Sequence, residues 1–246
     1  PEYARYGSFD ILGENNEKRL NELFQSMSSL KAAHGTVEQK ISDLYKMGLD
    51  SLRRNEEGAA PLMPYIDGIL AIADKDALVR EIAAMHLASD SPFFGTYVMA
   101  DMIDSDSNIL YMSQSGLGMG DRDYYVNGCD PKLKAGYLAF LTKVLELAGI
   151  DDAEGRAADA LKVEDALAES SWTSVECRDM ERQYNPTTFA ELAATYPNLS
   201  LGSYFESLGV KPEGKIIVTQ PSFFKALDGL FASSDVAVLK NYMLGQ

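Results

Sequence analysis

Apolar residues recur every three or four positions along most of this chain, which is the spacing of one face of an α-helix. The clearest case covers residues 14–30, where leucine, phenylalanine and methionine occupy positions 20, 23, 24, 27 and 30. Several later segments have the same pattern. They predict helices over residues 36–52, 62–73, 76–88, 131–148 and 152–171.

Helix boundaries are marked by capping residues, glycine and proline. Thr36 and Gln39 have the spacing of a capping box, which predicts a helix start. Asp130 before Pro131 is a typical start as well, and Gly149 is a typical end. The same reasoning predicts shorter helices over residues 199–208 and from positions 185, 221 and 234.

The pattern changes between residues 97 and 113. Residues that favour β-strands flank the polar run 104–108, whose composition is typical of a turn. We therefore predict an antiparallel hairpin there, and a short strand over residues 215–219. The predicted fold is mainly α: a multi-helix lobe with a small antiparallel β-hairpin.

A glycine-rich segment follows the predicted hairpin directly. Residues 114–125 read QSGLGMGDRDYY, and the three glycines suit a backbone that turns tightly or lies close to another backbone. A phosphate-binding loop would need a lysine and a helix signature after it, and both are missing. We predict a structural corner between hairpin and helices, with structural roles for Arg122, Tyr124 and Tyr125.

Composition describes a folded, strongly acidic chain. It has 246 residues, of which 46% are hydrophobic and 24% charged, enough to bury a sizeable core. The formal charge of −15 would repel a polyanion, so we expect no nucleic-acid partner. No apolar run approaches the about 20 residues that span a bilayer, so we expect no membrane contact by this chain. Cys129 and Cys177 are too few for a disulfide scaffold, and their pairing stays open.

Five segments, in chain order, resemble motifs of one enzyme family. The segments are RYGSFDIL (5–12), SPFFGTYVMADMIDSDSNILYMSQ (91–114), QSGLGMGDRDYY (114–125), VECRDMERQYNPTTFAEL (175–192) and PSFFKALDGL (221–230). They are similar to the non-catalytic part of the neprilysin-type zinc metallopeptidases, which include neprilysin, endothelin-converting enzyme and bacterial secreted oligopeptidases. Gly120 stands where this family usually has proline, so we expect a looser turn at that point.

The catalytic zinc motif of that family is missing from this sequence. It consists of two histidines one helical turn apart with a glutamate that acts as general base, H-E-x-x-H. The only histidines here are His34 and His86, which lie far apart in the sequence. We expect His34 at a solvated helix end and His86 packed within a helix. The resemblance thus implies zinc in the parent enzyme, while we expect this chain alone to bind none and to be inactive.

The resemblance places a substrate-binding group near the start of the chain. Arg5 matches the family arginine that pairs with the terminal carboxylate of a peptide substrate, and a guanidinium suits that task because it binds a carboxylate with two parallel hydrogen bonds. Phe9 matches the wall of the adjacent apolar pocket, and Asp10 matches an aspartate near the arginine. Gly13 departs from neprilysin, which has a second arginine there. Without the resemblance, the favoured interpretation of Arg5 is a surface arginine near a chain end, ion-paired with Asp10 and contributing little; with the resemblance, the binding role is favoured.

The resemblance implies a substrate-gating and peptide-binding lobe of a zinc metalloendopeptidase. We expect residues 1–246 to form a single helical lobe within a larger two-lobe enzyme outside the cytoplasm, either secreted, periplasmic or membrane-anchored. Its expected partners are peptide substrates and the catalytic lobe of the same polypeptide. The alternative is a freestanding helical binding or scaffold protein without enzymatic activity. A third possibility, an unrelated cytosolic helical enzyme, would need a catalytic constellation that the sequence does not contain.

Overall fold

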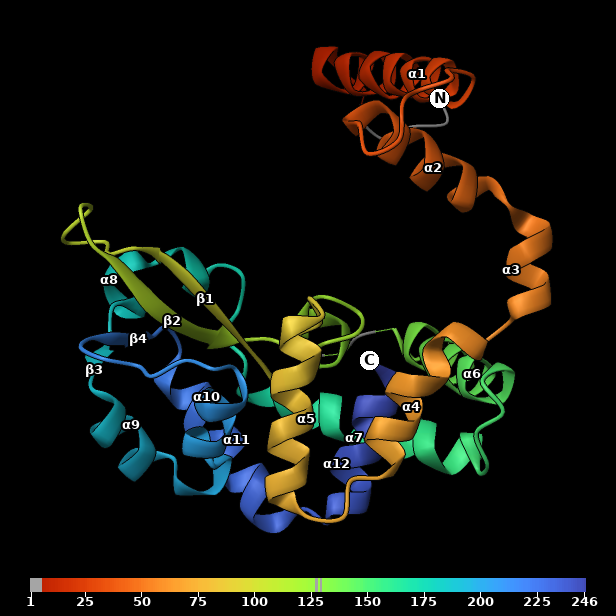
Figure 1. The fold of residues 1–246 in the computed structure, drawn as a ribbon. Coiled ribbons are helices and arrows are strands. Elements are labelled where there is room, and N and C mark those ends of the chain that lie inside the picture. The colour runs from red at the N-terminus through yellow and green to blue at the C-terminus, as the bar shows by residue number, and fades with distance from the viewer. Residues whose placement is uncertain (1–5, 127, 129) are drawn as a thin grey trace. The chain divides into compact units, whose positions relative to one another are not determined.

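The computed structural model describes residues 6–126, 128 and 130–246 of the chain. It divides into two compact units, Pro1–Pro61 and Leu62–Gln246. Helices dominate the described residues of both units, which confirms the mainly α prediction (Figure 1). Whether residues 1–246 act as a single lobe within a larger enzyme stays a prediction.

The described residues of the first unit form helices that pack through a few side chains. Its elements are α1 (Ser8–Ser28), α2 (Val37–Leu49) and α3 (Ser51–Glu57). Phe24 of α1 stacks on Tyr45 of α2 with ring centroids 5.8 Å apart, and the Tyr45 hydroxyl donates a hydrogen bond to Asn21 at 3.2 Å. Thr36 caps α2 as predicted, since its hydroxyl accepts from the backbone N–H of Gln39 at 3.3 Å.

Two helix boundaries in this unit differ from the prediction because aspartates cap the helices. The first helix begins at Ser8 rather than at residue 14, and the Asp10 carboxylate accepts a hydrogen bond of 2.6 Å from the Gly7 backbone N–H. The predicted helix 36–52 is broken in two. Asp50 ends α2, and its side chain caps α3 by accepting from the backbone N–H of Arg53 at 3.0 Å.

In the second unit, α7 (Ala153–Ser170) lies at the centre of the helical packing. It contacts α6 (Pro131–Leu147), α11 (Pro221–Ser233) and α12 (Val236–Gly245). The face of α7 toward α12 carries small residues such as Ala160, which is fully buried. A Cβ atom on Gly245 would lie 3.3 Å from the Cβ of Ala160, so small side chains set how closely these two helices approach. The other helices of this unit are α4 (Met63–Leu70), α5 (Lys75–Leu87), α8 (Met180–Gln183), α9 (Phe189–Thr195) and α10 (Leu201–Ser207), with 3-10 turns at Arg122–Tyr124, Glu176–Arg178 and Pro197–Leu199. A further 3-10 turn, Ala60–Leu62, begins in the first unit.

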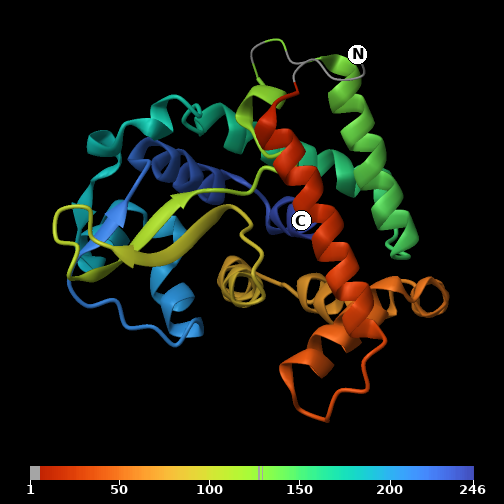
Figure 2. The ribbon, with the colours of Figure 1, turned by 90° about the horizontal axis from the view of Figure 1, so that it is seen from above.

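A small mixed sheet packs against these helices. Strands β1 (Phe94–Ala100) and β2 (Asn108–Gln114) form the predicted antiparallel hairpin, which Figure 2 shows from above. The predicted strand over 215–219 is β4 (Ile216–Val218), and it pairs in parallel with β2. With β3 (Pro186–Thr187) on its other side, the strand order is β1-β2-β4-β3. The sheet therefore extends beyond the hairpin that the sequence predicted.

Two predicted helix starts are wrong by a few residues. Pro186 begins the short strand β3 rather than a helix. The helix begins at Phe189 instead, because Thr188 and Glu191 form a complete capping box. The last helix begins at Val236 rather than at Ser234.

A buried tyrosine links the hairpin, the glycine-rich segment and the last helix. The hydroxyl of Tyr242 on α12 accepts a hydrogen bond of 3.0 Å from the backbone N–H of Phe93 and donates one of 2.8 Å to the carbonyl of Gly116. Tyr242 and Phe93 are both fully buried, and their ring centroids lie 4.4 Å apart. One side chain thus satisfies two buried backbone groups that have no partner within a helix or strand.

The backbone at Gly116 tests this arrangement. Its φ is +91°, and a Cβ atom there would lie 2.2 Å from the Tyr242 hydroxyl and 2.6 Å from the Phe93 nitrogen. We expect Gly116→Ala to lower the free energy of unfolding by about 3 kcal/mol, because the backbone is strained and the tyrosine must move. Urea unfolding followed by circular dichroism measures it. Gly136→Ala on α6, where a Cβ meets nothing within 4 Å, is the control and is expected to be neutral or stabilising; equal losses in the two variants would contradict the prediction.

Candidate peptide-binding site

Two of the three predicted substrate-binding residues lie in the first turn of α1. Phe9 is 86% exposed, so its ring presents apolar surface to solvent. Asp10 is also exposed, and its Oδ2 atom bonds to the backbone N–H of Gly7. The Tyr6 hydroxyl donates to the carboxylate of Glu14 at 2.9 Å, which ties the residues before the helix to its second turn.

The third predicted residue, Arg5, lies outside the described residues. Phe9 and Asp10 lie on one helical turn. The binding roles of all three residues stay predictions. The helix cap that Asp10 forms is a second role that the sequence comparison alone did not indicate. It follows from the three-residue spacing between Gly7 and Asp10.

The glycine corner, residues 114–125, is closed by hydrogen bonds of its own. The backbone N–H of Met119 donates to the hydroxyl of Tyr125 at 2.8 Å, and Tyr125 is buried. At Gly118 a Cβ atom would lie 1.9 Å from the hydroxyl of Tyr137, so only glycine fits there. The structural role predicted for Tyr125 is confirmed, whereas Tyr124 is 47% exposed.

A buried glutamate on α7 joins this corner to the helices. Glu164 is fully buried; its Oε2 accepts from the Tyr125 hydroxyl at 2.5 Å, and its Oε1 accepts from Tyr137 at 2.9 Å and from the Gln246 amide at 3.0 Å. The backbone N–H of Gly118 also bonds to it. Burial raises the pKa of Glu164, and the hydrogen bonds oppose that rise only in part.

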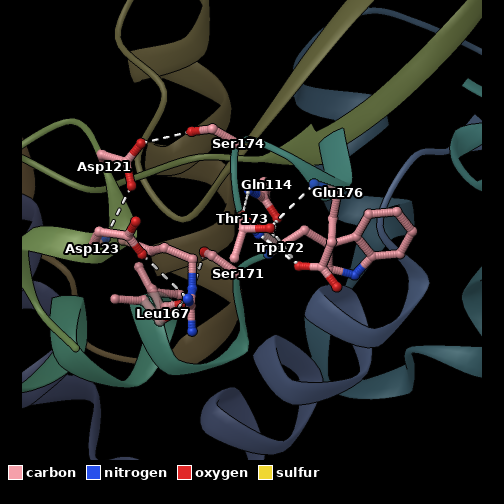
Figure 3. A network of polar contacts seen from close by, with 11 residues as sticks. Gln114, Asp121, Asp123, Leu167, Ser171, Trp172, Thr173, Ser174 and Glu176 are labelled. Carbon is pink, nitrogen blue, oxygen red and sulfur yellow. Dashed lines mark hydrogen bonds and ion pairs between the residues drawn. The ribbon is translucent and has the colours of Figure 1, made fainter. Parts of the chain in front are cut away.

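The start of the corner is attached to the segment after α7. The side-chain amide of Gln114 makes two hydrogen bonds to the backbone of Trp172, accepting from its N–H at 2.7 Å and donating to its carbonyl at 3.0 Å (Figure 3). This pair of bonds is the pattern that a neighbouring strand would make. The ring of Trp172 is in turn covered by the guanidinium of Arg182, whose Cζ lies 4.4 Å from the ring centroid.

The charged end of the corner has local partners. Asp121 accepts from the Ser174 hydroxyl at 2.7 Å and from the backbone N–H of Asp123 at 2.9 Å (Figure 3). These hydrogen bonds lower the pKa of Asp121. Arg122 donates from Nε to the carbonyl of Ala168 at the end of α7, which confirms a structural role for this arginine.

His86 takes the place that the sequence predicted for it, whereas His34 lies in the turn between α1 and α2 rather than at a helix end. His34 is exposed. His86 is half-buried on α5, where Nδ1 lies 2.7 Å from the Tyr204 hydroxyl and Nε2 lies 3.3 Å from the carbonyl of Pro92. Burial lowers the pKa of His86. Across residues 6–126, 128 and 130–246, no three histidine, cysteine or acidic side chains gather as a metal site would require.

Glu164 was not among the residues predicted from the sequence. Its helix was predicted, but the burial of its carboxylate was not. A signal was present in the small residues around it: Ala157, Ala160, Val163 and Leu167 are all buried, and Glu164 lies on the same side of the helix. A carboxylate among such residues is buried only when donors surround it, and those donors come from segments distant in the sequence.

A comparison with family models gives a match that covers the whole chain. The model for the N-terminal region of peptidase family M13 matches residues 1–246. The chain belongs to peptidase family M13. The neprilysin-type resemblance is thereby confirmed. In the described part of this M13 chain, no helix combines the length and apolar character needed to cross a bilayer.

Curated relatives of this M13 chain include endothelin-converting enzyme 1. The enzyme of Bos taurus is 29% identical over 257 residues, which cover 98% of this chain and 34% of the relative. The enzyme of Homo sapiens is also 29% identical, with 98% and 33% covered. The chain thus spans about a third of the length of the curated relatives it matches.

Solved structures of the zinc metalloprotease ZMP1 of Mycobacterium tuberculosis have the same fold. The open state has a TM-score of 0.89 at 28% identity, over 99% of this chain and 38% of that one. A complex of the protease with an inhibitor has a TM-score of 0.89 at 27% identity, over 97% and 37%. PepO from Lactobacillus rhamnosis, with a TM-score of 0.78 at 17% identity, shows the fold alone.

The buried carboxylate makes a testable contribution to the pH dependence of stability. Because the pKa of Glu164 is raised on folding, the folded chain keeps a proton there after the unfolded chain has released it. The resulting stabilisation is complete below the unfolded pKa of about 4.5 and is lost as the pH rises through the folded pKa. We expect the free energy of unfolding of the wild type, minus that of Glu164→Gln, to fall over this interval in urea titrations.

The control is Glu169→Gln, the same substitution at an exposed position of α7. It measures the effect of removing a carboxylate that is not buried. A wild type and a Glu164→Gln variant whose stabilities change in parallel with pH would contradict the assignment.

Proposed function

We propose that this chain is the substrate-gating and peptide-binding lobe of a neprilysin-like zinc metalloendopeptidase. The observation that carries the proposal is the match of residues 1–246 to the N-terminal region of the M13 family, combined with coverage of only about a third of the relatives. In this proposal a catalytic lobe outside residues 1–246 supplies the zinc, the activated water and the general base. This lobe selects and orients the peptide.

The start of α1 has chemistry that suits the end of a peptide. Arg5 supplies a guanidinium, which pairs with a terminal carboxylate through two parallel hydrogen bonds. The Gly7 backbone N–H at the N-terminal end of α1 is bonded to the Asp10 carboxylate, so the guanidinium of Arg5 supplies the positive charge of this segment. In a chain with a formal charge of −15, such a region favours a carboxylate that the rest of the surface repels.

Phe9 and Asp10 give this region its selectivity in our proposal. The exposed ring of Phe9 offers apolar surface to the peptide side chain next to the terminal carboxylate. Asp10 bonds to the Gly7 backbone and holds the first turn of α1 in its helical form. Gly13 replaces the second arginine of neprilysin, so we propose that the terminal carboxylate is bound by one guanidinium only.

The same proposal places the enzyme outside the cytoplasm. It is supported by the resemblance to neprilysin-type enzymes rather than by any segment of this chain. The partners of the lobe are then peptide substrates and the catalytic lobe of the same polypeptide. The similarity to the zinc metalloprotease ZMP1 supports zinc as the cofactor of the parent enzyme.

The first test separates the enzyme from a freestanding binding protein. The 246-residue chain expressed alone is expected to hold no stoichiometric zinc and to cleave no peptide, because the metal ligands belong to the catalytic lobe. The longer protein that contains it is expected to hold one zinc per chain and to lose its activity with a chelator. Metal analysis and a peptide-cleavage assay measure both. One tightly held zinc in the isolated chain, or cleavage by it, would sink the proposal.

The second test addresses Arg5 in the longer enzyme. Arg5→Ala is expected to raise KM about 10- to 100-fold for a peptide with a free terminal carboxylate, since a charged hydrogen-bonded pair is lost. The KM of the same peptide with an amidated C-terminus is expected to stay unchanged. Arg19→Ala, at an exposed position on α1, is the matched control. If Arg5→Ala changes KM equally for both peptides, the assignment is wrong.

A further inference from the structure

Strand β1 leaves part of its backbone without a partner strand. Among the residues that the structure describes, it is the end member of the sheet and pairs only with β2. In the turn, the backbone N–H of Asp101 donates to the carbonyl of Ser107 at 2.8 Å, and hydrogen-bonded pairs alternate along an antiparallel ladder. The N–H and C=O groups of Thr96 and Val98 therefore point away from β2.

This edge lacks the features that normally keep a strand from pairing with another chain. Natural edges carry lysine, proline or a bulge, but β1 reads FGTYVMA and keeps a regular register with β2. Its middle residues are large, apolar and exposed: Tyr97 by 41%, Val98 by 68% and Met99 by 44%. Because side chains alternate across a strand, apolar surface lies on both sides of the unpaired backbone.

A pocket at the end of β1 indicates which side chain an added strand would carry. Its volume is about 360 Å³, and it is lined by Met102, Ile103, Met180, Glu181 and Tyr184. Lys215 donates to the hydroxyl of Tyr184 at 2.8 Å, but its charge is paired with the Asp101 carboxylate. Apolar walls with the Glu181 carboxylate among them then suit the long stem and cationic head of arginine or lysine. Asp104 and Asp106 add exposed negative charge at the tip of the same hairpin.

We propose that the edge of β1 binds an extended, cationic peptide segment as an additional strand. Main-chain hydrogen bonds to Thr96 and Val98 hold the segment, and the pocket beyond β1 takes an arginine or lysine side chain. The proposal deepens the proposed function by adding a substrate class. It rests on that function in one respect: the bound peptide is a substrate only if the chain is part of a peptidase. The edge is in the second unit and uses neither Arg5 nor a terminal carboxylate.

The probe is a fluorescently labelled peptide, acetyl-TVTVTRT-amide, whose blocked ends prevent capture through a carboxylate. Binding to the full 246-residue chain is measured by fluorescence anisotropy. Val98→Pro removes an N–H that the ladder with β2 does not use, and proline is tolerated at such edge positions. We expect Val98→Pro to weaken binding about tenfold relative to Val98→Thr, which keeps the N–H. Replacing the arginine of the probe by glutamate is also expected to weaken binding.

Hydrogen exchange of the wild-type chain gives a readout that does not depend on the folding of a variant. Saturating probe is expected to slow exchange at the amides of Thr96 and Val98, with no change at amides of α11. Equal affinities of Val98→Pro and Val98→Thr, or unchanged exchange at both amides, would overturn the proposal. Protection that appears without probe and rises with protein concentration would also overturn it, since the occupant would then be a second copy of the chain.

Failure of this proposal is distinguishable from failure of the proposed function. The Arg5 test uses a free terminal carboxylate, whereas the probe here has none. If the probe does not slow exchange at the β1 edge but KM depends on Arg5, the proposal of an added strand is wrong and the proposed function as a peptidase lobe still holds.

Discussion

The hydroxyl of Tyr242 holds together parts of the second unit that the chain order separates. It bridges the Phe93 backbone, just before β1, and the Gly116 backbone, just after β2, from the last helix. Both backbone groups are buried, so each would cost free energy without this partner. The same contact accounts for three features: the lack of space for a side chain at Gly116, the tilt of the Tyr242 ring against Phe93, and the path of the glycine corner. The hairpin is thereby positioned from its base, while the outer edge of β1 has no partner strand among the described residues.

The corner depends on a second buried group for its other half. Glu164 receives hydroxyl donors from Tyr125 and Tyr137, which come from the corner and from α6. An acid in this position is acceptable only because its donors are complete, and their geometry leaves no room for a side chain at Gly118. The family motif is thus a packing motif. Gly116 and Gly118 leave space for tyrosine hydroxyls, and Tyr125 donates a hydrogen bond to the carboxylate of Glu164 on α7. Binding is proposed elsewhere, at the start of α1 and at the edge of β1.

Local signals in the sequence were sufficient for most elements and insufficient for long-range pairing. Thr36 and Asp130 cap helices as predicted, because a cap depends on residues within one turn. The helix start at Asn185 was wrong because two local signals compete there: Asn-Pro is a common start, and Thr188 with Glu191 is a stronger one three residues later. The parallel pairing of β4 with β2 and the burial of Glu164 depend on contacts between distant segments, which no local pattern encodes. The predicted site was identified only through family motifs, since an exposed phenylalanine and a capping aspartate have no distinctive pattern by themselves.

The parallel pairing of β2 with β4 has a consequence for how the chain folds during synthesis. Thr219, directly after β4, bonds to the carbonyl of Met112 across 107 residues of sequence. A ribosome adds about 5 to 20 residues per second, so the hairpin leaves the exit tunnel seconds before its parallel neighbour exists. During that interval both edges of the hairpin are open. Tyr111 and Met112 of β2, which are buried in the folded chain, are then exposed to water. The topology therefore leaves the hairpin with two open edges, which are prone to pair with other chains, until β4 is added.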